Sequence, residues 1–174
     1  MLGYHICDTA FGYVAVLFQK GPFLVTRIFL PSDSRRSQIE RIRTVASAAA
    51  METEETKAFC RQIQAYFEGI PLKPFWEYLD LTGLTSLQQR VLKTVGTIPH
   101  GSTQTYGQIA RRIDRPKAYR FVGATMQRNP FPLVIPCHRV IRTDGSLGGF
   151  GGGVTLKKRL LALEKGSVLS RNKC

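Results

Sequence analysis

The chain has 174 residues, a formal net charge of +13, and 43% hydrophobic and 10% aromatic residues. This is the composition of a globular protein that buries its own core, which excludes a disulfide-built miniprotein, a fibre and a disordered tail. No run approaches the roughly 18 to 20 apolar residues of a membrane span, and the first residues lack the layout of a signal peptide. We therefore expect no membrane contact and a place in the cell interior, cytoplasmic in a prokaryote and nuclear in a eukaryote.

The first half of the chain has the pattern of a sheet with helices. Two β-rich runs, 13–18 and 23–30, flank a Gly-Pro turn and predict a hairpin. The polar stretch 32–50 has helical spacing in its middle. A clearer amphipathic helix is centred on 59–67 and is expected to stop at Gly69.

The second half has the pattern of short helices. Residues 86–89 match a capping box at the start of one helix. Two more, 105–113 and 118–128, are joined by a tight turn, as in a helix-turn-helix, although helical hairpins also occur in proteins that do not bind DNA. We expect Thr155 to cap the last helix.

Positive charge is concentrated in this second half. Up to Asp80 there are nine Lys or Arg and nine Asp or Glu, whereas the other 94 residues carry 16 basic and three acidic groups. A segment with this excess of positive charge favours binding to a polyanion, most commonly nucleic acid. The alternative is a generic basic surface, which would carry the same excess of positive charge. Because the element type changes at the same place, we predict two domains, residues 1–82 and 83–174.

The four cysteines, Cys7, Cys60, Cys137 and Cys174, are scattered without CxxC pairing. This pattern indicates neither a disulfide framework nor a zinc ribbon, and a reducing compartment fits it best. His5 and Cys7 could share one face of a strand, but two ligands do not make a structural zinc site. We expect no metal and no other cofactor.

A reactive constellation is predicted at the end of the segment 129–140. An apolar run bounded by prolines leads to Cys137, His138 and Arg139 in succession. A cysteine nucleophile needs a neighbouring base or positive charge, which the next two residues could supply. Contact between Cys137 and His138 requires an irregular turn, which Pro136 favours. A structural cysteine beside a solvated His-Arg pair is the alternative.

Glu164 in the last helix could orient His138. It shares a face with the leucines of that helix, so a half-buried carboxylate there should seek a partner. We predict a relay from Cys137 through His138 to Glu164. The alternative is that Glu164 pairs with a neighbouring lysine or arginine of its own helix.

The segment 144–153 is dense in glycine, which permits close backbone approach and hinge motion. We expect a loop that folds over a planar ligand, and a plain flexible connector would look similar. It lacks the strand, Lys and Ser/Thr of a phosphate-binding P-loop.

Several motifs together resemble the methylated-DNA–protein-cysteine methyltransferases, also called alkylguanine-DNA alkyltransferases. They are Ile135-Pro136-Cys137-His138-Arg139-Val140, Arg120-Phe121-Val122-Gly123, Asn129-Pro130, Thr105-Tyr106 and Leu160-Leu161-Ala162-Leu163-Glu164. The resemblance covers about residues 85–165, and the first half matches only in element order. It implies an α/β (α+β) fold, with an N-terminal ribonuclease-H-like β-sheet with helices and a mainly helical, winged-helix-like helix-turn-helix domain.

The resemblance also implies direct DNA repair. Members of the family bind double-stranded DNA in the minor groove and flip an alkylated guanine out of the stack. They transfer the alkyl group from O6 to a cysteine irreversibly, once per molecule, and O4-alkylthymine is a further expected substrate. The expected activity is that of a methylated-DNA–[protein]-cysteine S-methyltransferase acting as a monomer.

The resemblance assigns catalytic roles residue by residue. Cys137 would accept the alkyl group, His138 would deprotonate it through a water molecule, and Glu164 would orient His138. Tyr106 would help to turn the nucleotide out and donate to the base, because guanine leaves as an anion.

Arg120 would fill the gap left by the flipped nucleotide, and Asn129 would couple the recognition helix to the reactive centre. The other expected DNA-binding residues are Tyr119, Phe121, Gly123, Thr105, Lys117 and Arg128. The other expected substrate-binding residues, besides Asn129, are Met126, Arg139, Val140, Phe150 and Gly151.

Some positions depart from the family pattern. Tyr119 and Phe121 stand where small residues are usual, Phe150 replaces a tyrosine, and Gly151 replaces a common serine. Two other functions stay open: a winged-helix DNA-binding regulator with a structural Cys137, and a Cys-His hydrolase that turns over an ester or amide.

Overall fold

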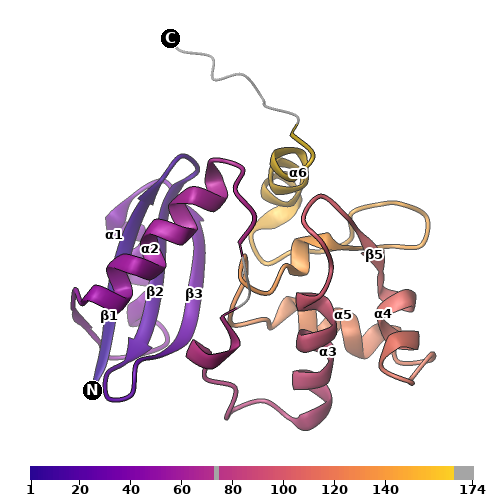
Figure 1. The fold of residues 1–174 in the computed structure, drawn as a ribbon, viewed down its shortest axis with the longest axis horizontal. Coiled ribbons are helices and arrows are strands. Elements are labelled where there is room, and N and C mark those ends of the chain that lie inside the picture. The colour runs from indigo at the N-terminus through magenta and orange to yellow at the C-terminus, as the bar shows by residue number, and fades with distance from the viewer. Residues whose placement is uncertain (73–74, 167–174) are drawn as a thin grey trace.

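The computed structural model describes residues 1–72 and 75–166 (Figure 1). Its first half is built on a sheet with the strand order β3-β2-β1-β4. The strands are β1 (Leu2–Thr9), β2 (Gly12–Gln19), β3 (Leu24–Ser32) and β4 (Ala49–Ala50). β2 runs antiparallel to both β1 and β3, whereas the short β4 runs parallel to β1.

Two helices, α1 (Arg35–Arg43) and α2 (Glu54–Phe67), cover opposite faces of this sheet, with α2 in front of the strands in Figure 1. The alternation of β2 explains the arrangement. Val14 and Val16 face α2, and Ala15 and Leu17 face α1. Because both faces are covered, β2 is apolar at every central position.

The predicted hairpin is confirmed as β2 and β3, and the predicted helices of this half are confirmed as α1 and α2. The first strand, β1, was raised in the sequence only as a possible strand through His5 and Cys7. Its sequence mixes glycine, histidine and aspartate with apolar residues, and it becomes a strand through its pairing with β2 along its whole length.

The second half is mainly helical. Its helices are α3 (Ser86–Gly96), α4 (Tyr106–Arg112), α5 (Tyr119–Gln127) and α6 (Gly153–Glu164). Two 3-10 turns, η1 (Trp76–Tyr78) and η2 (Cys137–Arg139), lie outside them. Two short strands, β5 (Gln104–Thr105) and β6 (Val140–Ile141), pair in parallel. The packed pair α4 and α5 is the predicted helix-turn-helix.

Two predicted helix starts were wrong. α3 is capped by Thr85 instead of Ser86, because the Thr85 hydroxyl accepts from the backbone N–H of Gln88 and the Gln88 side chain reaches back to the Thr85 N–H. The last helix begins at Gly153, so Thr155 lies inside its first turn and does not cap it.

The two halves share buried surface. A single cluster of buried apolar residues extends from the α2 face of the sheet to α3, α4, α5 and α6 within the described part of the chain. The backbone N–H of Ile28 in β3 donates to the carbonyl of Pro130 at 2.8 Å, which ties the sheet to the segment that precedes Cys137. The predicted boundary after residue 82 falls between η1 and α3.

The expectation that the cysteines are unpaired was wrong for two of them. Cys7 of β1 and Cys60 of α2 form a disulfide with their Cα atoms 5.5 Å apart. They are 53 positions apart in sequence, so the contact depends on α2 packing against β1 and leaves no spacing motif. Cys137 is free and buried. Across residues 1–72 and 75–166, no helix is long and apolar enough to cross a membrane.

Candidate active site

Cys137 starts the η2 turn directly after Pro136, within a run, 131–140, that is buried throughout. Asn129 shapes this segment, since its amide nitrogen donates to the carbonyl of Ile135 at 2.9 Å and its amide oxygen accepts from the N–H of Phe131 at 3.0 Å. The irregular turn expected from Pro136 is therefore present.

His138 and Glu164 are in direct contact. Nε2 of His138 lies 2.6 Å from Oε1 of Glu164, and both side chains are fully buried. The same carboxylate accepts from the Arg139 guanidinium at 2.8 and 2.9 Å and from the N–H of Gly101 at 3.0 Å. Burial by itself would raise the pKa of Glu164, but the bonds from His138 and Arg139 outweigh burial and hold that pKa well below its usual range.

This contact sets the tautomer of the imidazole. An ionised carboxylate can only accept, so Nε2 of His138 carries the hydrogen and Nδ1 is left as the basic nitrogen. Nδ1 is buried and has no hydrogen-bond partner among the described residues. Burial lowers the pKa of His138, against the opposing effect of Glu164, so the resting imidazole is neutral.

Cys137 rests as a thiol. Burial raises its pKa, while the hydrogen bond from Asn129 and the charge of Lys157 act in the opposite direction. A neutral thiol whose neighbour in sequence is a neutral imidazole backed by a carboxylate can form a thiolate when Nδ1 accepts the proton. The arrangement can therefore serve chemically as a nucleophile with a base and an orienting group.

Tyr66 of α2 reaches the same site and was not among the predicted site residues. Its hydroxyl donates to Oε1 of Glu164 at 2.8 Å and lies 3.2 Å from Nε2 of His138. The sequence placed Tyr66 on the apolar stripe of its helix. A hydroxyl in such a stripe needs a buried partner, and that was the signal available.

Lys157 of α6 was also missed. It is buried, and its ammonium donates to the carbonyl of Val140 at 2.6 Å and to the carbonyl of Leu147. Burial lowers the pKa of Lys157 to about 8. Through these two hydrogen bonds, Lys157 links α6 to β6 and to the glycine-rich loop.

Arg139, for which a substrate-binding role is predicted, contacts Glu164 in the structure. Its guanidinium is buried and is held by Glu164 and by the carbonyl of Ile98, the latter at 2.6 Å. The structure therefore groups Arg139 with the support of Glu164.

Tyr106 lies at the start of α4, half-buried, between α5 and the glycine-rich loop. Its ring is 3.9 Å from the position that a Cβ at Gly123 would take, and its neighbour Thr105 caps α4. Burial, followed by the negative charge that Cys137 can carry, raises the pKa of Tyr106. The ring of Phe150 stands edge-on to His138 with centroids 6.4 Å apart.

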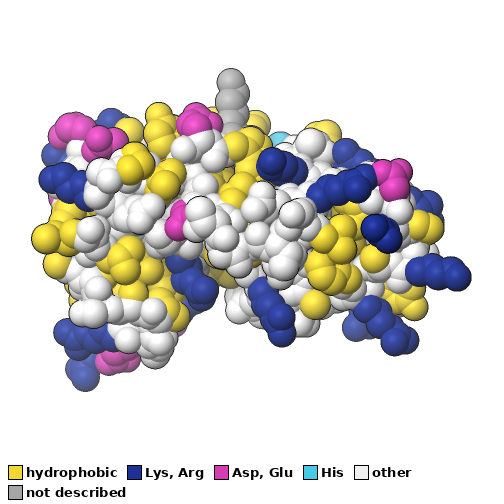
Figure 2. Space-filling model, turned by 90° about the horizontal axis from the view of Figure 1, so that it is seen from below, with side chains coloured by type: hydrophobic (Ala, Val, Ile, Leu, Met, Phe, Trp, Pro, Cys, Tyr) yellow, Lys and Arg dark blue, Asp and Glu magenta, His cyan; other side chains and the backbone are white. Residues whose placement is uncertain are grey.

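The remaining predicted residues divide between surface and core. Lys117, Arg120 and Arg128 are exposed on or beside α5, and the Arg120 guanidinium lies 6.0 Å from the centroid of the Tyr119 ring. Met126 and Val140 are buried, Phe121 is partly buried, and Gly151 is exposed. Figure 2 shows Lys and Arg side chains spread over the half of the molecule that contains α4 and α5.

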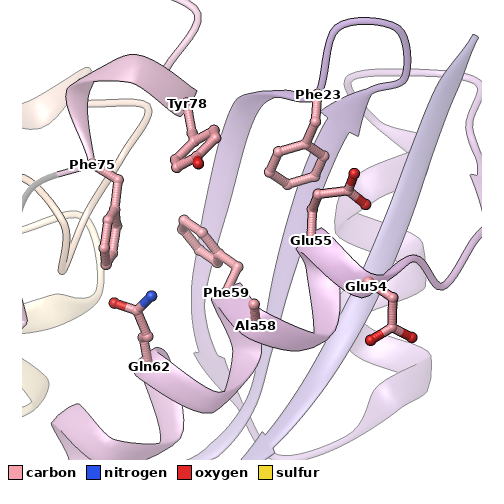
Figure 3. A pocket seen from close by; sticks show the side chains of 8 residues that line it. All are labelled: Phe23, Glu54, Glu55, Ala58, Phe59, Gln62, Phe75 and Tyr78. Carbon is pink, nitrogen blue, oxygen red and sulfur yellow. The ribbon is translucent and has the colours of Figure 1, made fainter.

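An aromatic cavity of about 340 Å³ lies elsewhere, on the first half of the chain. Figure 3 shows the rings of Phe23, Phe59, Phe75 and Tyr78 turned toward one another around it. It contains no residue of the predicted site. Within the described residues, no group of three His, Cys, Asp or Glu side chains is arranged to hold a metal ion.

Comparison with known proteins gives consistent matches. Residues 86–166 match the family "6-O-methylguanine DNA methyltransferase, DNA binding domain". A methylated-DNA–protein-cysteine methyltransferase of Methanothermobacter thermautotrophicus is 47% identical over 108 residues, and one of Methanosarcina mazei is 46% identical over 118 residues. These alignments cover 62% and 66% of this chain and 60% and 73% of the relatives. The alignment with the Methanothermobacter relative spans less than two thirds of that relative's length. The same holds for a Mycobacterium leprae relative, of which the alignment spans 65%.

Solved structures match over nearly the whole chain. The O6-methylguanine methyltransferase of Mycobacterium tuberculosis superposes with a TM-score of 0.72 at 33% identity, covering 95% of this chain and 94% of that one. The structure of Mycobacterium tuberculosis OGT in complex with DNA gives a TM-score of 0.75 at 36% identity, with coverages of 94% and 93%.

Proposed function

Because this chain belongs to the methylated-DNA–protein-cysteine methyltransferase family, we propose that it repairs DNA by transferring the alkyl group of O6-alkylguanine to Cys137. O4-alkylthymine is a second expected substrate. The observation that carries the proposal is the buried series formed by Cys137, His138 and Glu164, with Nε2 of His138 2.6 Å from the carboxylate.

The proposed reaction begins with proton transfer. Nδ1 of His138 takes the thiol proton of Cys137 through a water molecule, and Glu164 stabilises the imidazolium that forms. The thiolate attacks the alkyl carbon, the bond from that carbon to O6 breaks, and its electron pair stays on guanine. Tyr106 donates toward the developing anion, which then takes back the proton held by His138. Because water does not readily displace the thioether, each molecule reacts once.

DNA binding is assigned to the helix-turn-helix. Arg120 is exposed on α5 and free to enter the stack, while Lys117 and Arg128 flank it at the two ends of the helix. The protein is proposed to bind double-stranded DNA as a monomer in the cell interior. The complex of the Mycobacterium tuberculosis relative with DNA supports this partner. Tyr119, Phe121, Gly123 and Thr105 belong to the same pair of helices.

The base pocket is assigned to the surroundings of Cys137. Val140 would contribute its backbone and Phe150 its ring, and the lack of a side chain at Gly151 would leave space for the base. Met126 of α5 and Asn129, which follows that helix, would complete the pocket. The edge-on contact of the Phe150 ring with His138 supports its assignment as an apolar wall of this pocket.

The test is the intact mass of the protein after incubation with a duplex that carries one O6-methylguanine. We expect one added methyl group per molecule, located on Cys137 by peptide mapping and absent from Cys137→Ala. Binding without a gain in mass would instead indicate a DNA-binding module with a structural cysteine. Turnover of an ester or amide without lasting modification would indicate a Cys-His hydrolase.

A further inference from the structure

Tyr66 joins the first half of the chain to the reactive centre. It lies on α2, against the sheet, and its hydroxyl lies between two groups of the second half, Glu164 of α6 and His138 of η2. The Tyr66 side chain is fully buried. The Tyr66 hydroxyl oxygen therefore contacts Glu164, 98 positions later in the sequence, and His138, 72 positions later.

The direction of these hydrogen bonds is determined by charge. Burial and the neighbouring Glu164 carboxylate raise the pKa of Tyr66 far above its usual range, so the hydroxyl keeps its hydrogen and donates it to Oε1. The lone pairs of the same oxygen are then available to the N–H at Nε2 of His138, 3.2 Å away. Tyr66 thus acts as donor to one member of the relay and acceptor from the other.

We propose that Tyr66 is a positioning residue for alkyl transfer, which holds the Glu164 carboxylate and the His138 imidazole in the orientation that turns Nδ1 toward Cys137. This inference rests on the proposed function and adds a role for the first half of the chain in the reaction. Without the hydroxyl, the carboxylate is free to turn toward Arg139, and the imidazolium formed during thiol activation loses one of two acceptors.

Tyr66→Phe tests the proposal because it removes only the hydroxyl. We expect the rate constant of methyl transfer to fall about tenfold, as for the loss of one hydrogen bond to a charged group. The fall should be the same with a methylated duplex and with a free O6-alkylguanine base, because the Tyr66 hydroxyl contacts His138 and Glu164, which take part in the chemical step.

A second readout is the pH profile of Cys137 alkylation by iodoacetamide. In Tyr66→Phe its midpoint should rise by about half a pH unit, since thiolate formation depends on the imidazolium. The other polar or titratable groups around the thiol, which are unchanged in the variant, are Asn129, His138, Lys157 and Tyr106. To resolve Cys137 from the other cysteines, the modified peptides are quantified by mass.

Ile63→Val is the matched control, one turn earlier on α2 and equally buried, with one methylene removed. It should react at the wild-type rate with the wild-type midpoint. A Tyr66→Phe protein with unchanged rate and midpoint, or an equal loss in Ile63→Val, would overturn the positioning role. Failure of the wild-type protein to accept a methyl group overturns the proposed function instead, and the iodoacetamide profile still reports on Tyr66.

Discussion

Gly148 of the glycine-rich loop lies directly against the hydroxyl of Tyr106 at the start of α4. A Cβ atom at Gly148 would come within 3.0 Å of that oxygen, and the residue has a φ of +67°. The loop and the helix-turn-helix therefore meet at a point where only a glycine fits without displacement.

Gly148→Ala should slow methyl transfer about tenfold, because overpacking displaces Tyr106 or the loop. Gly145→Ala is the matched control, since Gly145 lies in the same loop with a φ of +81° but has nothing within 4 Å of its Cβ position. Both variants share the backbone strain, so both should lose some stability. Single-turnover rates that are equal in the two variants would contradict a role for the contact with Tyr106.

Glu164→Gln should raise the pH at which Cys137 becomes reactive, because the imidazolium of His138 loses its anionic partner. It should also lower the free energy of unfolding by about 3 kcal/mol, since Arg139 is left buried without its carboxylate. The stability advantage of the wild type exists above the ordinary glutamate pKa of 4.5 and is lost as pH falls below it, because the folded pKa is depressed. Urea titrations from pH 7 to pH 3 check this, and a constant difference across that range would disprove the assignment.

Arg120→Ala should slow transfer from a methylated duplex about tenfold, corresponding to about 1.4 kcal/mol of the cost of extruding a nucleotide. Transfer from a free O6-alkylguanine base should be unchanged, because Arg120 is exposed and is not part of the buried contact between His138 and Glu164. Arg36→Ala, an exposed arginine on α1, serves as the control for lost charge. An equal loss of transfer rate with the duplex and with the free base would contradict the proposal that Arg120 fills the gap left by the flipped nucleotide.

Lys157→Met should change the pH dependence of stability. The pKa of Lys157 is lowered from 10.5 to about 8, so between these values the unfolded chain binds the proton and the folded protein does not. Stability of the wild type should therefore rise, relative to Lys157→Met, as pH increases from about 8 toward 10.5. The variant should also transfer more slowly, since the link between Val140 and the loop is lost. Parallel stability curves for the two proteins would show that the buried ammonium titrates normally.

The disulfide between Cys7 and Cys60 should stabilise the first half of the chain. Closing a loop of 53 positions corresponds to about 3 to 4 kcal/mol, so reduction should lower the melting temperature. Cys7→Ala should melt at the same temperature with and without reductant. A thiol titration of the denatured protein, giving two reactive cysteines before reduction and four after, checks that the bond is present. Four thiols before reduction would show that it is absent.

Local patterns in the sequence were sufficient for much of the fold and of the site. Two β-rich runs around a Gly-Pro turn predicted the hairpin of β2 and β3, and helical spacing predicted α1 to α6 to within a few residues. The neighbours Cys137 and His138 predicted the nucleophile and the base of the proposed reaction. The position of Glu164 on the apolar face of its helix predicted its contact with His138, which the structure contains. The hairpin and the helices depend on residues close together in sequence, and Cys137 and His138 are adjacent.

Only the tertiary structure decided which distant groups meet around Glu164. Tyr66 and Arg139 both bind its carboxylate, Lys157 holds the Val140 carbonyl, and Cys7 pairs with a cysteine of α2. A tyrosine in an apolar stripe and a lysine in a helix have many possible partners. The partners that they find depend on the packing of α2 against the sheet and of α6 against η2. The energy of that packing depends on how well side chains throughout the core fit together.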